Sequence, residues 1–342
     1  MSDKKIKGVS ISNDLLYERR KLADLLPLDT PLSIDFHAST FCNIKCVFCM
    51  HSSKNKCYDS IKNKILDFEV LKKTVDEIKL FPSKIKAIHF CGLGEPLINK
   101  NLAEMIKYVK QSNICDKVDI NSNGILFNKE KTDQIISSGP DYIRISINGL
   151  SSEGFKEYTG ADVDFEQYVK NLTYLYNNRE KTKIYIKILN FMVDTKEKKE
   201  FFYKVFEPIC DNIHIENYNE CFLDTEGKEK IDKSNLTQRG ESLDSQKCCP
   251  QPFFKIEILP DGRVVPCSEA QIPIVVGNVK DDSIVNIWNS STWNKFRLKM
   301  LSGSEFAGKV CSDCVLTKLC SFSSDNIDSE INRLTTYYKS KI

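Results

Sequence analysis

The sequence lacks the long apolar segments from which membrane spans and secretory signals are built. No apolar run approaches the roughly 20 residues that cross a bilayer, and the basic start with Lys4, Lys5 and Lys7 leads into polar sequence rather than a signal core. Net charge is also nearly absent, because 49 Lys and Arg oppose 47 Asp and Glu. Nucleic-acid-binding domains carry a basic excess, so an RNA-modifying enzyme is disfavoured. We expect a cytoplasmic protein that binds neither membrane nor nucleic acid.

Cysteine, by contrast, is abundant and clustered. Fourteen cysteines occur in 342 residues. Ten fall in two regions, which contain Cys42, Cys46, Cys49 and Cys57, and then Cys248, Cys249, Cys267, Cys311, Cys314 and Cys320. In a reducing compartment, clustered cysteines indicate metal binding or catalysis more often than disulfides. The sequence therefore predicts two metal centres.

Strand-like and helix-like segments alternate between the two cysteine regions. The expected strands are Leu32–Ser39, Ala87–Cys91, Val118–Ser122, Tyr142–Ile147, Lys183–Met192 and Asn212–Tyr218. The expected helices are Phe68–Leu80, Leu102–Gln111, Lys129–Ser138, Phe165–Asn178 and Lys196–Phe206. This alternation predicts an α/β fold of βαβ units with a parallel sheet. Polar residues alternate with apolar ones along several strands, which favours a partial, six-stranded barrel with a polar interior over an open sheet buried on both faces.

The length corresponds to about two domains. We expect a lead-in over 1–30 with a short helix around Asp14–Leu26, a barrel over 31–218, a polar linker over 219–247, a cysteine-rich domain over 248–325 and a tail over 326–342. Within the cysteine-rich domain, Phe253–Leu259 and Arg263–Cys267 flank an Asp-Gly turn and predict a β-hairpin. A helix is expected over Ile284–Leu301.

The first cysteines follow the first expected strand with the spacing CxxxCxxC, at Cys42, Cys46 and Cys49. Catalytic residues of barrel enzymes lie at the carboxyl ends of the strands. Three thiolates at this spacing can hold three irons of a [4Fe–4S] cluster and leave the fourth iron open to a ligand. A structural zinc, completed by His51 or Cys57, fits the same cysteines, so the spacing alone leaves both metals open.

Four motifs at successive strand ends resemble the radical S-adenosylmethionine (radical SAM) superfamily. They are the CxxxCxxC segment with Phe48 before its last cysteine, Gly92-Leu93-Gly94-Glu95-Pro96, Asn121-Ser122-Asn123-Gly124 and Ser146-Ile147-Asn148-Gly149. Leu93 departs from the family's commonest pattern, in which two glycines are adjacent. The resemblance implies a [4Fe–4S] cluster on Cys42, Cys46 and Cys49. It also implies contacts to S-adenosylmethionine from Phe48, Gly92, Gly94, Glu95, Pro96, Asn121, Asn123, Ser146 and Asn148, although Phe48 fits the core equally well.

The second cysteine region has the pattern of a closed site with four thiolates. Cys249 and Cys267 flank the hairpin turn, and Cys311 and Cys314 form a CxxC pair, with Cys320 beyond it. Zinc and an iron–sulfur cluster satisfy this spacing equally.

The same region resembles the C-terminal SPASM extension of radical SAM enzymes, in its shortened twitch form. The similar segments are Cys249-Pro250, Asp261–Cys267, Gly277–Val279 and Ile287-Trp288, and Ser324 stands where a further cysteine is expected. The resemblance implies one auxiliary [4Fe–4S] cluster. Its expected ligands are Cys249, Cys267, Cys311 and Cys314, with Cys320 or Cys248 as replacements.

The resemblance implies an oxidoreductase that cleaves S-adenosylmethionine reductively to a 5′-deoxyadenosyl radical and abstracts hydrogen from its substrate. It also implies an electron donor such as flavodoxin or ferredoxin. Similar enzymes act on peptides or on carbohydrate-like small molecules such as aminocyclitols, and peptide-modifying members often have a leader-binding domain before the barrel. About thirty residues precede the first expected strand, so we expect dehydrogenation of a small molecule. The alternative is a maturase of a peptide or protein. A zinc-stabilised binding protein is a remote third alternative.

Four inward-facing residues of the expected barrel are candidates for substrate contact and catalysis: Arg144, Lys187, His214 and Glu216. Lys187 or Glu216 would take the proton of a substrate hydroxyl, because deprotonation of the substrate radical assists loss of its electron. The alternative is that these charges pair within the barrel and take no part in chemistry.

Two separate thiolate groups lead to a prediction about metal content. Protein purified without oxygen should be brown and contain about eight irons and eight sulfides per chain, as two [4Fe–4S] clusters require. Iron and sulfide analysis with the visible spectrum measures this. Stoichiometric zinc in a colourless protein would contradict both assignments, whereas about four irons would contradict only the second.

Overall fold

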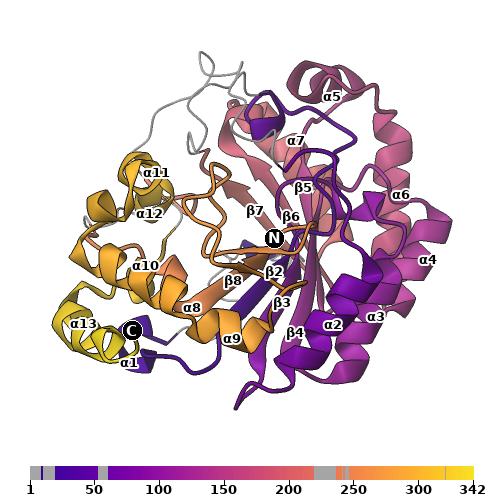
Figure 1. Ribbon diagram of the computed structural model, residues 1–342. Helices are drawn as coiled ribbons and strands as arrows, with labels where there is room; N and C mark the ends of the chain where they lie inside the picture. Colours follow the sequence, from indigo (N-terminus) through magenta and orange to yellow (C-terminus); the bar gives the residue numbers. More distant parts are fainter. Residues whose placement is uncertain are drawn as a thin grey trace.

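Parallel strands dominate the protein (Figure 1). The computed structural model describes residues 9–10, 20–52, 61–218, 236–240, 242, 246–319 and 321–342. Its strands are β1 Val9–Ser10, β2 Ser33–Phe36, β3 Ile85–Phe90, β4 Cys115–Ser122, β5 Tyr142–Ile147, β6 Lys183–Leu189, β7 Asn212–Glu216, β8 Lys255–Ile258, β9 Arg263–Val265 and β10 Gly277–Asn278. They form one sheet with the order β1-β7-β6-β5-β4-β3-β2-β8-β9-β10.

The six strands from β2 to β7 are parallel and follow one another across the sheet, which confirms the predicted partial barrel. Beyond β2, the sheet continues into the cysteine-rich domain. Strand β8 pairs with β2 in parallel, and β9 and β10 then add in antiparallel fashion. Because β8 and β9 are paired antiparallel strands, the predicted hairpin is also confirmed. One hydrogen-bonded sheet therefore extends from the barrel into the cysteine-rich domain.

The helices of the barrel lie outside the sheet, as Figure 1 shows. The helices are α1 Leu22–Leu25, α2 Phe68–Ile78, α3 Leu102–Ser112, α4 Lys129–Ser137, α5 Ser152–Thr159, α6 Phe165–Asn177, α7 Lys196–Phe206, α8 Gln251–Phe254, α9 Ile284–Asn289, α10 Ser291–Ser302, α11 Lys309–Asp313, α12 Leu316–Leu319 and α13 Ile331–Lys339. Capping side chains fix several of their first residues. Asp67, Asn128, Asp164 and Thr195 each accept a hydrogen bond from a backbone N–H in the first turn of α2, α4, α6 and α7. In the described part of the chain, no helix is long and apolar enough to cross a membrane.

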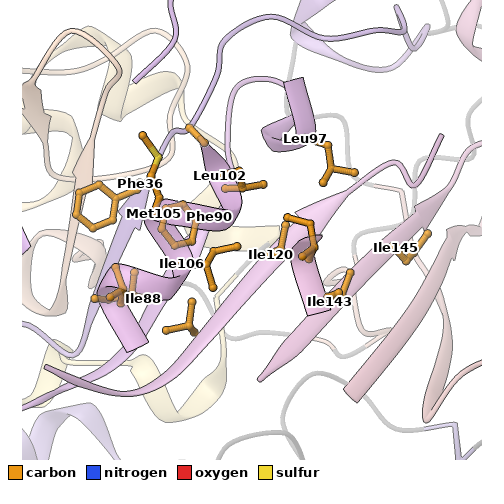
Figure 2. Close-up of a cluster of buried hydrophobic side chains, with 14 of the residues drawn as sticks. Phe36, Ile88, Phe90, Leu97, Leu102, Met105, Ile106, Ile120, Ile143 and Ile145 are labelled. Atoms are coloured by element: carbon orange, nitrogen blue, oxygen red, sulfur yellow. The ribbon is translucent and has the colours of Figure 1, made fainter. Parts of the chain in front are cut away.

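The apolar faces of the strands meet the helices in one main core. Figure 2 shows Ile88 and Ile120 of neighbouring strands near Met105 and Ile106 of α3, with Ile143 of the next strand beyond Ile120. These five side chains are fully buried. The apolar members of the alternating pattern thus face the helices, and the polar members are left to the inner face of the sheet.

Charged side chains of β2 and β8 form a buried network on this inner face. Lys255 Nζ lies 2.9 Å from Asp35 Oδ2 and 2.6 Å from Glu257 Oε1. Glu257 also accepts a hydrogen bond from His37 Nε2 at 2.8 Å, while His37 Nδ1 accepts one from the backbone N–H of Leu93 at 3.2 Å. Although burial raises the pKa of Glu257, Lys255 and His37 bring it below its usual range. The network therefore ties the cysteine-rich domain to the barrel.

Two expected elements differ in the structure. The helix expected over Ile284–Leu301 is divided into α9 and α10, because Ser290 has an extended backbone and its hydroxyl accepts a hydrogen bond from Trp293 N to start the second helix. The segment expected as a tail contains α13, where Leu334 and Tyr338 pack in a second apolar cluster. Most of the expected linker, and much of the expected N-terminal helix before α1, lie outside the described residues.

The buried network generates a prediction about stability. Replacement of Lys255 by Met should lower the free energy of unfolding by about 3–5 kcal/mol, because it leaves two buried carboxylates without their cation. The matched control is Lys86→Met, which removes an ion pair with Asp116 in which the lysine side chain is 68% exposed. This control should change stability by about 1 kcal/mol or less. Denaturant unfolding monitored by circular dichroism compares the two variants, and equal midpoints would contradict the prediction.

Candidate active site

The loop with the first three cysteines follows β2 and is anchored by α5. Its backbone N–H groups at Lys45 and Val47 donate to the carbonyl oxygens of Thr159 and Tyr158, at 3.0 and 2.9 Å. These carbonyls belong to the C-terminal turn of α5, where helix carbonyls lack intrahelical partners. The loop therefore provides donors for the free carbonyl groups at the end of α5, and the same hydrogen bonds hold the loop in place.

The three thiols of this loop lie close together. The pKa of Cys42 is raised to about 11 and that of Cys46 well above its usual range, in both cases mainly by burial. Cys49 contributes to both shifts, so the three sulfurs lie within Coulombic reach of one another. In a [4Fe–4S] cluster each cysteine binds a different iron, so three neighbouring thiols fit three irons and leave the fourth iron without a cysteine.

One ring nitrogen of His51, considered above as a zinc ligand, is hydrogen-bonded. Its Nε2 donates a hydrogen bond to the carbonyl oxygen of Leu93 at 2.6 Å, and burial lowers its pKa. Cys57, the other possible fourth ligand, lies outside the described residues.

Glu95 is a buried carboxylate next to the cysteine loop, with 2% exposure. It accepts hydrogen bonds from Leu97 N at 3.1 Å, from Ser122 Oγ at 2.8 Å and from Asn123 N at 2.8 Å. Burial raises its pKa to about 7, although these bonds act in the opposite direction. Glu95 in turn raises the pKa of Cys42. A positively charged group bound beside Glu95 would favour its ionised form, so the site suits an ammonium ligand near the cysteines.

The glycines before Glu95 allow its loop to pack against the segment after β2. Gly92 has a φ of +112°, and a β-carbon there would overlap the imidazole of His37. A β-carbon on Gly94 would overlap the carbonyl oxygens of Ser39 and Phe41. Pro96 then begins the short 3-10 turn that Glu95 caps. Both glycines are thus required by the close approach of two loops.

The remaining residues expected around the cofactor line the ends of β3 to β5. Asn123 donates from Nδ2 to Asn43 Oδ1 at 2.8 Å, and that nitrogen lies 4.0 Å from Cys42 Sγ. The Asn121 Oδ1 atom is buried without a hydrogen-bond partner among the described residues. Asn148 is buried and donates to the carbonyl oxygen of Ser146 at 3.0 Å. An orphaned buried acceptor of this kind fits a bound polar ligand or water.

Phe48 packs in an aromatic group rather than standing alone. Its ring centroid lies 5.7 Å from that of Phe191 and 6.2 Å from that of Tyr218, both edge-on. Tyr158 contacts Phe191 in the same manner at 5.7 Å. The ring therefore joins the cysteine loop to the segments after β6 and β7.

The second site is a cavity with about 380 Å³ of empty space, open in part to solvent. Four cysteines line it, as expected: Cys249, Cys267, Cys311 and Cys314. The pKa of Cys311 is raised to about 12, mainly by burial and in part by the nearby Cys249. Glu269 also lines the cavity, and its Oε2 accepts a hydrogen bond from Cys314 Sγ at 3.4 Å. Four thiols around one cavity fit an iron–sulfur cluster.

The two possible replacement ligands are Cys248 and Cys320. Cys248 is fully buried in the apolar cluster that contains Leu22 and Leu334, and it does not line the cavity. Cys320 lies outside the described residues.

The candidate substrate residues lie on the inner face of β5, β6 and β7. Arg144 Nη2 donates to Asp119 Oδ2 at 2.9 Å, and Lys187 Nζ donates to Glu216 Oε2 at 2.8 Å. Both cations are thus paired within the barrel, the alternative considered above. His214 is the register partner of Lys187, and its Nε2 is buried without a hydrogen-bond partner among the described residues. Burial lowers the pKa of His214.

Several residues at these sites escaped the sequence analysis. Ser122 lies inside a motif in which only its neighbours Asn121 and Asn123 are expected to contact the cofactor. His37 belongs to the polar face of the first strand, which was a usable signal. Glu269 stands two residues after Cys267, and nothing in the sequence distinguishes it from other acids.

Two family profiles match the chain. Residues 37–199 match the radical SAM superfamily, and residues 248–315 match SPASM, described as an iron–sulfur cluster-binding domain. The second match favours iron over zinc at the four-cysteine cavity.

Two curated relatives differ in the extent of their similarity. GTP 3′,8-cyclase of Clostridium perfringens (strain SM101 / Type A) is 27% identical over 144 residues, which are 42% of this chain and 42% of that protein. The match thus spans less than half of that relative's length. The tungsten-containing aldehyde ferredoxin oxidoreductase cofactor-modifying protein of Pyrococcus furiosus is 23% identical over 333 residues, with 82% of this chain and 86% of that protein covered.

Two solved structures share the fold. BtrN in complex with AdoMet and 2-DOIA has a TM-score of 0.51 and 17% identity, covering 83% of this chain and 92% of BtrN. Streptococcus suis SuiB bound to the precursor peptide SuiA has a TM-score of 0.58 and 18% identity, covering 81% of this chain and 69% of SuiB. The partial barrel with its three-cysteine loop and the adjoining four-cysteine cavity agree with both family matches, and the chain therefore belongs to the radical SAM superfamily and carries a SPASM iron–sulfur domain.

Proposed function

We propose that this radical SAM enzyme catalyses the two-electron oxidation of a hydroxyl group on a carbohydrate-like small molecule such as an aminocyclitol. In this proposal Cys42, Cys46 and Cys49 hold the first cluster, and the cavity around Cys267 holds the second. When bound, the cofactors supply a hydrogen-abstracting 5′-deoxyadenosyl radical at the first site and an electron acceptor at the second.

The residues around Glu95 support binding of S-adenosylmethionine at the first site. Three donors orient the Glu95 carboxylate, and none of them is a lysine or arginine in the part of the chain that the structure describes. It would therefore receive the ammonium group of the methionine part as its cation. Asn123 lies between Glu95 and Cys42, because its backbone N–H binds the first and its side chain approaches the second. The chain thus brings an ammonium site close to the cluster ligands.

The inner face of β6 and β7 supports a hydroxyl-bearing substrate. Lys187 has a side chain with 28% exposure, while its partner Glu216 has 5%. Glu216, hydrogen-bonded to this cation, would accept the hydroxyl proton of the substrate. The buried hydroxyl of Tyr185 and Nε2 of His214 lack hydrogen-bond partners among the described residues, so both would serve polar groups of a ligand.

The four-cysteine cavity is the observation that best supports a two-electron oxidation. Removal of hydrogen from a substrate carbon leaves one further electron to be removed before a carbonyl forms. A cluster held by Cys249, Cys267, Cys311 and Cys314 would accept this electron. The side chains that remove the proton lie in the barrel, so the two steps have separate groups in the same chain.

The direct test is an anaerobic incubation of the reconstituted enzyme with S-adenosylmethionine, a reductant and a panel of aminocyclitols and peptides. Mass spectrometry should find 5′-deoxyadenosine together with a dehydrogenated aminocyclitol. A modified peptide without any oxidised small molecule would overturn the proposal and support the maturase alternative.

The assignment of Glu95 predicts a selective loss of cofactor binding. Glu95→Gln keeps the shape of the side chain but removes the charge, so affinity for S-adenosylmethionine should fall by roughly tenfold or more, as expected for a charged hydrogen bond of about 1.5–3 kcal/mol. Iron content should stay unchanged. Equilibrium binding under anaerobic conditions measures the affinity. The contrasting variant is Cys46→Ala, which should lose the first cluster itself, and unchanged affinity in Glu95→Gln would contradict the assignment.

The assignment of the second cavity predicts uncoupling of cofactor cleavage from product formation. In Cys267→Ala, 5′-deoxyadenosine should still form, but the ratio of oxidised product to 5′-deoxyadenosine should fall strongly because the substrate radical has no electron acceptor. Chromatography of both products gives the ratio.

The control for this variant must separate uncoupling from misfolding, because a cluster contributes to folding. Circular dichroism and the iron of the first cluster provide it, and Cys248→Ala is a matched variant whose thiol does not line the cavity. A folded Cys267→Ala protein with an unchanged ratio would show that the second cluster is structural.

A further inference from the structure

The four-cysteine cavity contains one acidic side chain in addition to its thiols. Glu269 is 7% exposed and lines the cavity with Cys249, Cys267, Cys311 and Cys314. Its Oε1 accepts a hydrogen bond from Gln271 N at 3.1 Å, which orients the carboxylate, and its Oε2 accepts the hydrogen of the Cys314 thiol at 3.4 Å. The acid is therefore held against a candidate ligand.

The cavity offers Glu269 no cation. None of its lining residues in the described part of the chain is Lys, Arg or His. Burial is the main cause that raises the pKa of Cys311 and of Cys314. The carboxylate of Glu269 is close enough to contribute to both shifts. Five groups that can be negative thus converge on one partly enclosed space.

Cluster binding changes the relation between Glu269 and Cys314. A thiolate bound to iron has no hydrogen to donate, so the carboxylate then faces a negative sulfur. Coulombic interactions are strong at a site removed from water. Reduction adds a further negative charge to the cluster, so a nearby carboxylate destabilises the reduced form more than the oxidised form. Net charge and hydrogen bonds to the sulfurs are among the factors that set the potentials of iron–sulfur clusters.

We propose that Glu269 is a positioning residue for the auxiliary cluster and holds its reduction potential low through its contact with Cys314. The proposal rests on the proposed function only in that a cluster occupies this cavity. It adds a residue that tunes how readily the cluster accepts an electron. Ala270, the neighbour of Glu269, belongs to the same buried apolar cluster as Met50, which stands beside Cys49 of the first site.

The test isolates the auxiliary cluster by working in a Cys46→Ala background, which lacks the first cluster. In that background, Glu269→Gln removes the charge and keeps a side chain of the same size. Redox titration followed by electron paramagnetic resonance should show a midpoint potential shifted upward, with the iron content unchanged. The matched control is Glu305→Gln, which removes an exposed acid of the same domain and should leave the potential unchanged because solvent screens its charge.

Three outcomes would overturn the proposal. An unchanged potential in Glu269→Gln means that the carboxylate does not influence the cluster. Loss of auxiliary iron in folded Glu269→Gln protein means that Glu269 is a ligand rather than a neighbour. If Glu269→Gln does not fold, Glu269→Asp is the second variant, because its shorter side chain keeps the charge but moves it away from Cys314. A midpoint potential equal to that of the parent would then contradict the proposal. Absence of any auxiliary signal in the parent with Glu269 intact would refute the proposed function instead.

Discussion

The pairing of β2 with β3 on one edge and with β8 on the other is the constraint on which both sites depend. β3 ends beside β2 and leads to Glu95, so the three-cysteine loop and the carboxylate reach the same end of the barrel. β8 begins beside β2 and follows Cys249, so the second cavity is attached to the same strand. The buried charges of Lys255, Asp35 and Glu257 stabilise this junction from within. The four-residue strand β2 thus positions the three-cysteine loop and the four-cysteine cavity relative to each other.

The fold could be predicted largely from the sequence because the barrel depends on local periodicity. β5 and α7 have the bounds expected from their patterns, and the other expected barrel elements differ by a few residues at their ends. The helix α5, which anchors the cysteine loop, was not expected. The division between α9 and α10 was missed, since Ser290 sits in a segment whose apolar spacing continues across it. The helix α13 was missed because its stability comes from packing of Leu334 and Tyr338 on distant residues. Tertiary contacts of this kind leave little local signal.

The sequence was enough to predict which strand ends form the site, but not which atoms contact one another there. Motif spacing identifies the loops that meet, since the ends of parallel strands lie at one edge. It does not reveal which atom bonds to which, so the hydrogen bond from Ser122 to Glu95 was not expected. Glu269 is a stronger example, because its position depends on how the chain turns after β9. Charges predicted as substrate contacts, such as Arg144, are paired across strands that only the fold brings together.

The segment from Cys267 to Ile272 joins the two sites, and this has a consequence for electron movement. At one end it contributes a thiol and Glu269 to the second cavity, and at the other Ala270 and Ile272 pack against the loop of Cys49. The segment itself consists of bends and turns, and the paired strands β9 and β10 hold the chain on either side of it. Electron tunnelling depends steeply on the separation of donor and acceptor. If an electron passes between clusters at the two sites, as the proposed function requires, insertions or deletions within this segment would alter the tunnelling distance between them.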